Sequence, residues 1–100
     1  MSLVYAGICC HAPGITARSQ LAEPEQYKRL LDAFQRQSQA IVDAGTEAIM
    51  LVSSEHFANF FMNNMPTFSI GMADSYEGPI EDPDWLKIPR RDIPANPDLS

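Results

Sequence analysis

Two short apolar runs on either side of a long amphipathic helix constrain the fold of this chain more than any other feature. The runs are residues 3–10 (LVYAGICC) and 48–53 (AIMLVS). Short apolar runs of this kind are typical of strands buried on both faces of a parallel sheet. A strand, a crossover helix and a second parallel strand make a right-handed βαβ unit. The sequence therefore predicts an α/β fold, the start of a layered sheet-and-helix domain.

The helix between the two runs is indicated by apolar residues at helical spacing, which would place them on one face. These residues are Tyr27, Leu30, Leu31, Phe34 and Ile41. Pro24 suits the first helical position, and Gly45 suits the C-cap. We expect the helix to begin at Pro24 and to end at Gly45.

The second half of the chain gives weaker signals. Residues 66–72 (PTFSIGM) are consistent with a third short strand, and the proline-rich stretch after them predicts irregular structure. Asn96 and Pro97 are typical of a helix start close to the last residue. Two or three strands and one helix leave a sheet face and both sheet edges uncovered. We therefore expect residues 1–100 to be the N-terminal part of a single, truncated domain, covered by further chain or by a homo- or hetero-oligomeric partner.

Charge and cysteine content limit the classes of partner and compartment. Seven Lys and Arg stand against thirteen Asp and Glu, a formal net charge of −6. This balance argues against nucleic acid or an anionic membrane surface as a partner. Cys9 and Cys10 are adjacent, so they form no disulfide framework and are expected to be buried and structural. With no signal peptide and no membrane-spanning run in the sequence, we expect a cytoplasmic location.

Two histidines follow the two apolar runs. His11 comes directly after the first run and His56 shortly after the second. Parallel strands end at the same edge of a sheet, where α/β folds bind their ligands, so two imidazoles there could start a transition-metal site. Two histidines alone are more often a structural pair, and the spacing leaves both interpretations open. No spacing selects a third ligand among the acidic residues Glu55, Asp74, Glu77, Asp82 and Asp84.

The residues after His56 are rich in aromatic side chains. Phe57 and Phe60 could form a core or the wall of a pocket for an aromatic substrate, and Asn59 could bond a ligand or shape the loop. Glu55 is expected to orient an imidazole more than to bind metal. The pair Arg90 and Arg91 is expected to be solvated, with a substrate-carboxylate clamp as the alternative.

Three segments of the chain resemble the LigB-type (class III) extradiol ring-cleavage dioxygenases. They are Cys10-His11-Ala12-Pro13, Ser54-Glu55-His56-Phe57-Ala58-Asn59-Phe60-Phe61 and Met65-Pro66-Thr67-Phe68-Ser69-Ile70-Gly71. The resemblance runs over nearly the whole chain. Members of the family usually have Asp before the second histidine, and this chain has Glu55 there.

The resemblance implies an oxidoreductase of aromatic catabolism that cleaves a catechol-type ring with dioxygen at a non-haem Fe(II). By position, His11 and His56 match the two histidine ligands of the iron. The glutamate ligand and the catalytic histidine of the family have no counterpart in these 100 residues, so we expect this chain alone to be inactive. The alternatives are a non-catalytic subunit or regulatory module of the same fold, a zinc-binding relative, and a fragment that binds metal weakly.

Overall fold

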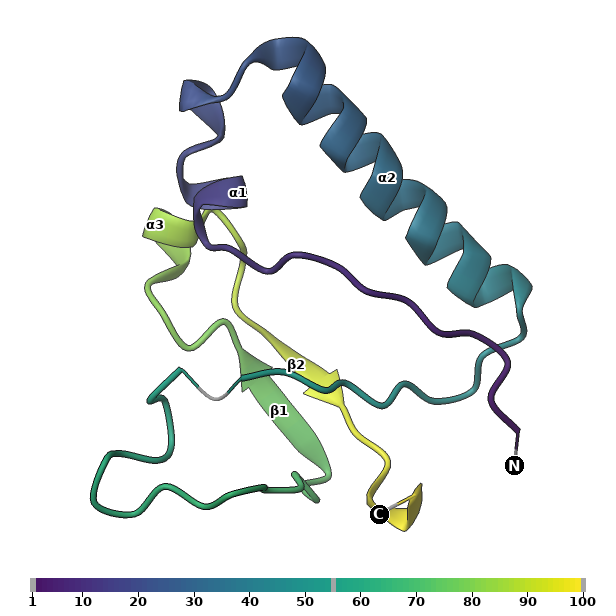
Figure 1. Cartoon of the computed structure of the whole chain (residues 1–100), viewed down its shortest axis with the longest axis vertical. Helices are drawn as coiled ribbons and strands as arrows, with labels where there is room; N and C mark the ends of the chain where they lie inside the picture. Colours follow the sequence, from purple (N-terminus) through teal and green to yellow (C-terminus); the bar gives the residue numbers. More distant parts are fainter. Residues whose placement is uncertain (1, 55, 100) are drawn as a thin grey trace. The chain divides into compact units, whose positions relative to one another are not determined.

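Helix α2 (Pro24–Asp43) is the longest element in the computed structural model of this chain, which describes residues 2–54 and 56–99 (Figure 1). Its N-terminus is capped by Glu23, whose carboxylate accepts hydrogen bonds from the amides of Glu25 and Gln26 at 3.0 and 2.8 Å. Its C-terminus is followed by Gly45, which has a φ of +66° and donates to the carbonyl of Val42 at 3.0 Å. The predicted helix and its start at Pro24 are therefore confirmed, while the C-cap is Ala44 and Gly45 lies one position beyond it.

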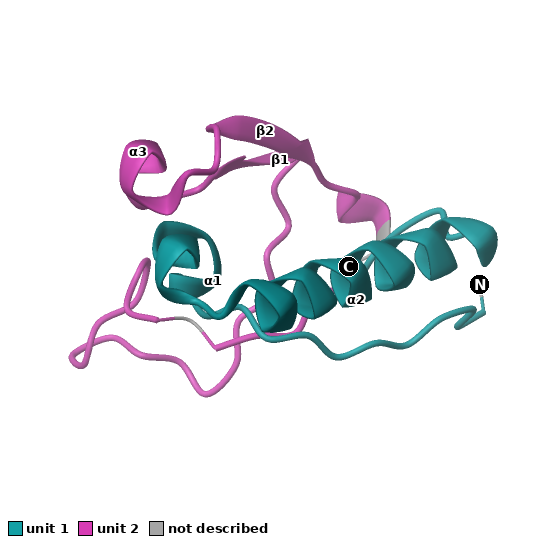
Figure 2. Cartoon of the chain, turned by 90° about the horizontal axis from the view of Figure 1, so that it is seen from above, with its two compact units in different colours: residues 1–49 teal, residues 50–100 magenta. Residues whose placement is uncertain are grey.

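The chain divides into two units, residues 1–49 and 50–100 (Figure 2). In the first unit, α1 (Gly14–Ala17) and the 3₁₀ turn η1 (Ser19–Leu21) precede α2. Ala17 is buried, at 7% exposure. Residues 2–10 are extended and run along α2 (Figures 1 and 2).

The second unit contains a two-stranded antiparallel ribbon of β1 (Ser75–Gly78) and β2 (Arg91–Pro94). The register places Tyr76 opposite Ile93, an aromatic and β-branched pair of the kind that stabilises sheets. The amide of Ala95 donates to the carbonyl of Asp74 at 2.9 Å, which continues the pairing past the end of the ribbon.

A one-turn helix, α3 (Pro83–Leu86), lies between the two strands in sequence. The Asp82 carboxylate accepts from the amide of Asp84 at 2.9 Å, and Pro83 occupies the first turn, where it needs no amide partner. Leu86 is buried at 6% exposure. After β2, the 3₁₀ turn η2 (Pro97–Leu99) begins at the proline that the sequence marked as a helix start.

The predicted parallel strands are wrong. Among the described residues, 3–10, 48–53 and 66–72 form no strand, and the only sheet is the antiparallel ribbon, in a stretch predicted to be irregular. A parallel strand buried on both faces needs helices over both faces of its sheet. Here the apolar side chains that would fill those layers face solvent, with Ile8 at 99% and Val52 at 87% exposure. The fold is a small mixed α/β arrangement of helices and one short ribbon.

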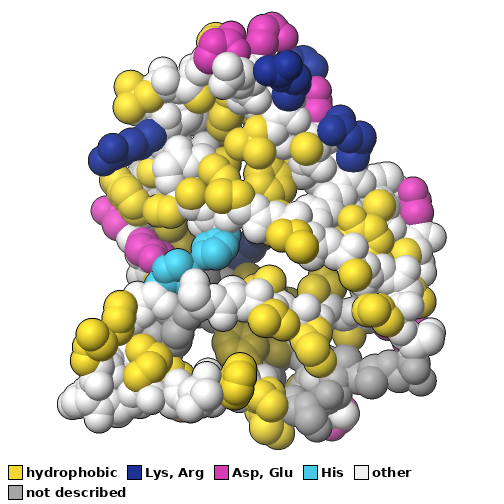
Figure 3. All heavy atoms as spheres, viewed as in Figure 1, with side chains coloured by type: hydrophobic (Ala, Val, Ile, Leu, Met, Phe, Trp, Pro, Cys, Tyr) yellow, Lys and Arg dark blue, Asp and Glu magenta, His cyan; other side chains and the backbone are white. Residues whose placement is uncertain are grey.

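Apolar side chains cover much of the surface (Figure 3). Ala17 and Leu86 are the buried hydrophobic residues of the described chain, and they lie in different units. No helix among the described residues has the length and apolar character to cross a membrane.

Candidate metal-ligand residues

His11 lies where the extended residues of the first unit end and the chain enters α1. Ala12 lies outside α1 and precedes a proline, which disfavours a helical conformation at Ala12. The amide of Ile15 donates to the Ala12 carbonyl at 3.1 Å and closes the turn that follows. The His11 side chain is exposed, so a ligand can reach it from solvent.

His56, in the second unit, follows the second apolar run, residues 48–53, shortly after its end. Its φ is +64°, and that of Phe57 is +59°. Two successive residues with side chains in the left-handed region are uncommon, and such backbone strain gathers at functional sites. The turn redirects the chain directly after the apolar segment and leaves the imidazole exposed.

Ser54 is a residue of the site that the sequence did not single out. Its Oγ lies 2.9 Å from Nε2 of His56, within hydrogen-bonding distance. The partner of one ring nitrogen determines the tautomer and orientation of a histidine, and so affects which nitrogen can bind a metal. The sequence feature that could have indicated Ser54 is a hydroxyl residue two positions before a histidine, at the end of an apolar run.

The three residues predicted to line a substrate pocket differ in exposure. Phe57 is exposed at 53%, Asn59 is exposed and Phe60 is half-buried. Beyond them, the amide of Phe61 donates to Oδ1 of Asn64 at 2.6 Å, and the Asn64 amide donates back to the Phe61 carbonyl at 2.9 Å. These two hydrogen bonds give Asn64 a role in shaping the loop, and the substrate pocket stays a prediction.

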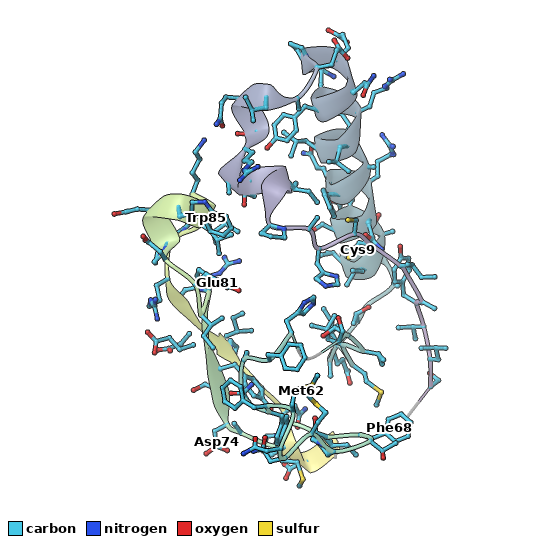
Figure 4. All side chains as sticks on the ribbon, turned by 60° about the vertical axis from the view of Figure 1, so that its left-hand side comes forward. Cys9, Met62, Phe68, Asp74, Glu81 and Trp85 are labelled. Atoms are coloured by element: carbon cyan, nitrogen blue, oxygen red, sulfur yellow. The ribbon has the colours of Figure 1, made fainter. Side chains whose placement is uncertain are left out.

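Three of the candidate carboxylates belong to the ribbon and to α3. Glu77 pairs with Arg90 across the ribbon, with 3.5 Å between Oε1 and Nη1. Asp82 caps α3, and Asp84 lies in its first turn. Asp74 directly precedes β1, Glu81 lies before α3 and Trp85 lies within it (Figure 4). The Glu77 ion pair gives Arg90 an intramolecular partner, while Glu55 lies outside the described residues.

His11 belongs to the first unit and His56 to the second. Within the second unit the structure brings Ser54 to His56 and Arg90 to Glu77. Across residues 2–54 and 56–99, no three His, Cys, Asp or Glu side chains are grouped as a metal site would require. Comparison with protein-family models, with curated proteins and with solved structures finds no match to this chain.

Proposed function

We propose that this chain supplies two histidine ligands, His11 and His56, to the non-haem Fe(II) centre of an extradiol dioxygenase that cleaves catechol-type rings. The observation that carries the proposal is the equivalent placement of the two histidines. Each is an exposed side chain at the point where an extended apolar segment gives way to a turn. Each also lies in a segment that resembles the ligand segments of LigB-type dioxygenases.

The donor chemistry of the two side chains fits this metal in part. Neutral imidazole is a good ligand for Fe(II), and two imidazoles with one carboxylate form the facial triad of non-haem iron oxygenases. The chain provides both imidazoles of such a triad. The carboxylate and the acid–base histidine are assigned by the resemblance to positions beyond Ser100, so iron binding and turnover are separable properties.

The residues around His56 have defined roles in this proposal. The Ser54 hydroxyl orients the imidazole through its contact with Nε2. Phe57, with its ring partly exposed, offers an apolar face to a planar aromatic substrate beside the ligand. A bound Fe(II) supplies a Lewis-acidic, redox-active centre for activating a catechol and dioxygen.

Anaerobic titration with Fe(II), read by iron content after desalting, tests the ligand assignment. We expect the affinity to fall by about tenfold or more in His11→Ala and in His56→Ala, because each removes one of two strong donors. Ser53→Ala is the matched control, because it alters a neighbouring exposed side chain without removing a donor. Unchanged iron affinity in both histidine variants contradicts the proposal.

Oxygen uptake with a panel of catechols tests the reaction. We expect no uptake by this chain and uptake by a polypeptide extended past Ser100, lost again when either histidine is replaced. Stoichiometric zinc in place of iron would support the zinc-binding alternative. Iron binding without uptake in the longer polypeptide would support a non-catalytic module.

A further inference from the structure

Cys9 and Cys10 are adjacent free thiols, and both are exposed. The expectation that they are buried is therefore wrong, because the segment that carries them forms no sheet. Side chains of successive residues in a regular strand point to opposite faces. Here both cysteines line the same hollow in the first unit, which has a volume of about 450 Å³.

The opposite wall of this hollow is helix α2. Figure 4 shows Cys9 beside the helix. Leu30 and Phe34 line the hollow from α2, and Tyr5 and Ile8 line it from the extended segment. Arg36 and Gln37 contribute polar surface to the same lining. The two cysteines therefore adjoin a partly apolar space that includes two aromatic rings, which a planar apolar group can contact.

The two thiols at this hollow suit a ligand that binds two protein sulfur atoms and needs no further protein group. No third His, Cys, Asp or Glu completes a metal-binding group around the thiols in the described part of the chain. Sulfur ligands select soft, thiophilic centres. A trivalent arsenic atom with an aryl substituent already has one carbon ligand, so two thiols complete its coordination and leave the ring for the hollow.

We propose that Cys9 and Cys10 form a dithiol site for aryl compounds of trivalent arsenic and similar thiophilic metalloids, with the aryl group in the hollow beside Phe34. In the reaction, two As–O bonds of the hydrated arsenical break and two As–S bonds form. The two thiol protons leave with the two hydroxides as water, and no atom changes oxidation state. A bridging atom also spans a wider gap than a direct S–S bond of about 2.05 Å, which adjacent cysteines accommodate poorly.

Phenylarsine oxide is the probe, added to the chain kept reduced with a phosphine. Intact-mass measurement is expected to show one phenylarsenic group per chain, with both thiols lost to a thiol titrant. Cys9→Ser and Cys10→Ser are each expected to weaken binding by roughly 100-fold or more, because the second As–S bond is intramolecular. Single-cysteine variants that bind as tightly as the original chain overturn the proposal.

The role of the hollow is tested by comparing the phenyl compound with its methyl analogue. The original chain is expected to bind the phenyl compound several-fold more tightly. Phe34→Leu keeps an apolar side chain on α2 but removes the ring, so it is expected to reduce that preference, with the helical circular dichroism signal as the check on folding. Equal binding of the two compounds by the original chain overturns the assignment of the aryl group to the hollow.

Discussion

At the scale of single residues, the most informative contact is the one between Ser54 and His56. His56 has a left-handed backbone conformation, and the Ser54 hydroxyl restrains its ring through a 2.9 Å contact with Nε2. Groups that hydrogen-bond a ligating histidine tune metal affinity without touching the metal. Ser54 is therefore a positioning residue for the proposed site.

Removing this hydroxyl tests that role. Ser54→Ala is expected to lower Fe(II) affinity by about 10- to 100-fold, because the imidazole loses the partner that selects its tautomer. Ser53→Ala is the control: the Ser53 hydroxyl makes only a 3.4 Å contact with the carbonyl of Ser54. The tautomer of neutral His56, read by nitrogen NMR, is expected to change in Ser54→Ala alone. Identical affinity and tautomer in the two variants would show that the contact has no role.

At the scale of secondary structure, the helix was predicted correctly from local sequence features, and the parallel strands were not. Pro24 and Gly45 mark the ends of α2 because a helix needs only its own residues to satisfy its backbone. Strands need partners distant in sequence. Residues 3–10 lie in the first unit, residues 48–53 cross from the first unit into the second, and neither segment forms a strand. The ribbon of β1 and β2 escaped notice because each strand is short and rich in polar residues, glycine or proline, which are poor strand formers.

The local features of the candidate site could be predicted from the sequence, and its side-chain contacts could not. Both histidines and their places at segment ends follow from the sequence, since a strand-like run and a breaker are local features. The Ser54 contact could not be predicted, because it depends on the conformation of a loop that includes a residue with positive φ, His56. The arrangement of the carboxylates could not be predicted either: the Glu77 pairing with Arg90 follows from the ribbon that the sequence did not indicate.

The C-terminal end of α2 gives a prediction at this scale. Gly45→Ala is expected to destabilise the helix by about 1 kcal/mol, because a residue with a Cβ atom pays for a φ of +66°. Gly14→Ala is the matched control, since an added Cβ there meets no atom within 4 Å and its φ is not positive. Thermal unfolding followed by circular dichroism at the helix band measures the difference. Equal midpoints for the two variants would mean that Gly45 does not limit the stability of α2.

At the scale of the whole molecule, the dominant feature of the described residues is the large number of exposed apolar side chains. Leu3 is 85% exposed, Met50 85% and Phe68 88%, in addition to Ile8 and Val52. Exposed apolar patches beyond a few hundred Å² are rare on monomeric proteins, and extended segments with unpaired backbone groups are templates for pairing with other chains. These exposed side chains lead us to predict association, and the homo- or hetero-oligomer expected from the sequence stays a prediction.

Self-association of the isolated chain is the measurable consequence. Sedimentation velocity at increasing concentration is expected to show species larger than the 11.1 kDa monomer. Val52→Lys is expected to shift the distribution toward monomer, because a charge in an extended apolar segment penalises edge pairing. Gln35→Lys adds the same charge at an exposed polar position of α2 and leaves the apolar segments intact, so the distribution should stay unchanged. A chain that stays monomeric at every concentration would contradict the prediction, and an equal response to both substitutions would trace the association to net charge instead of to residues 48–53.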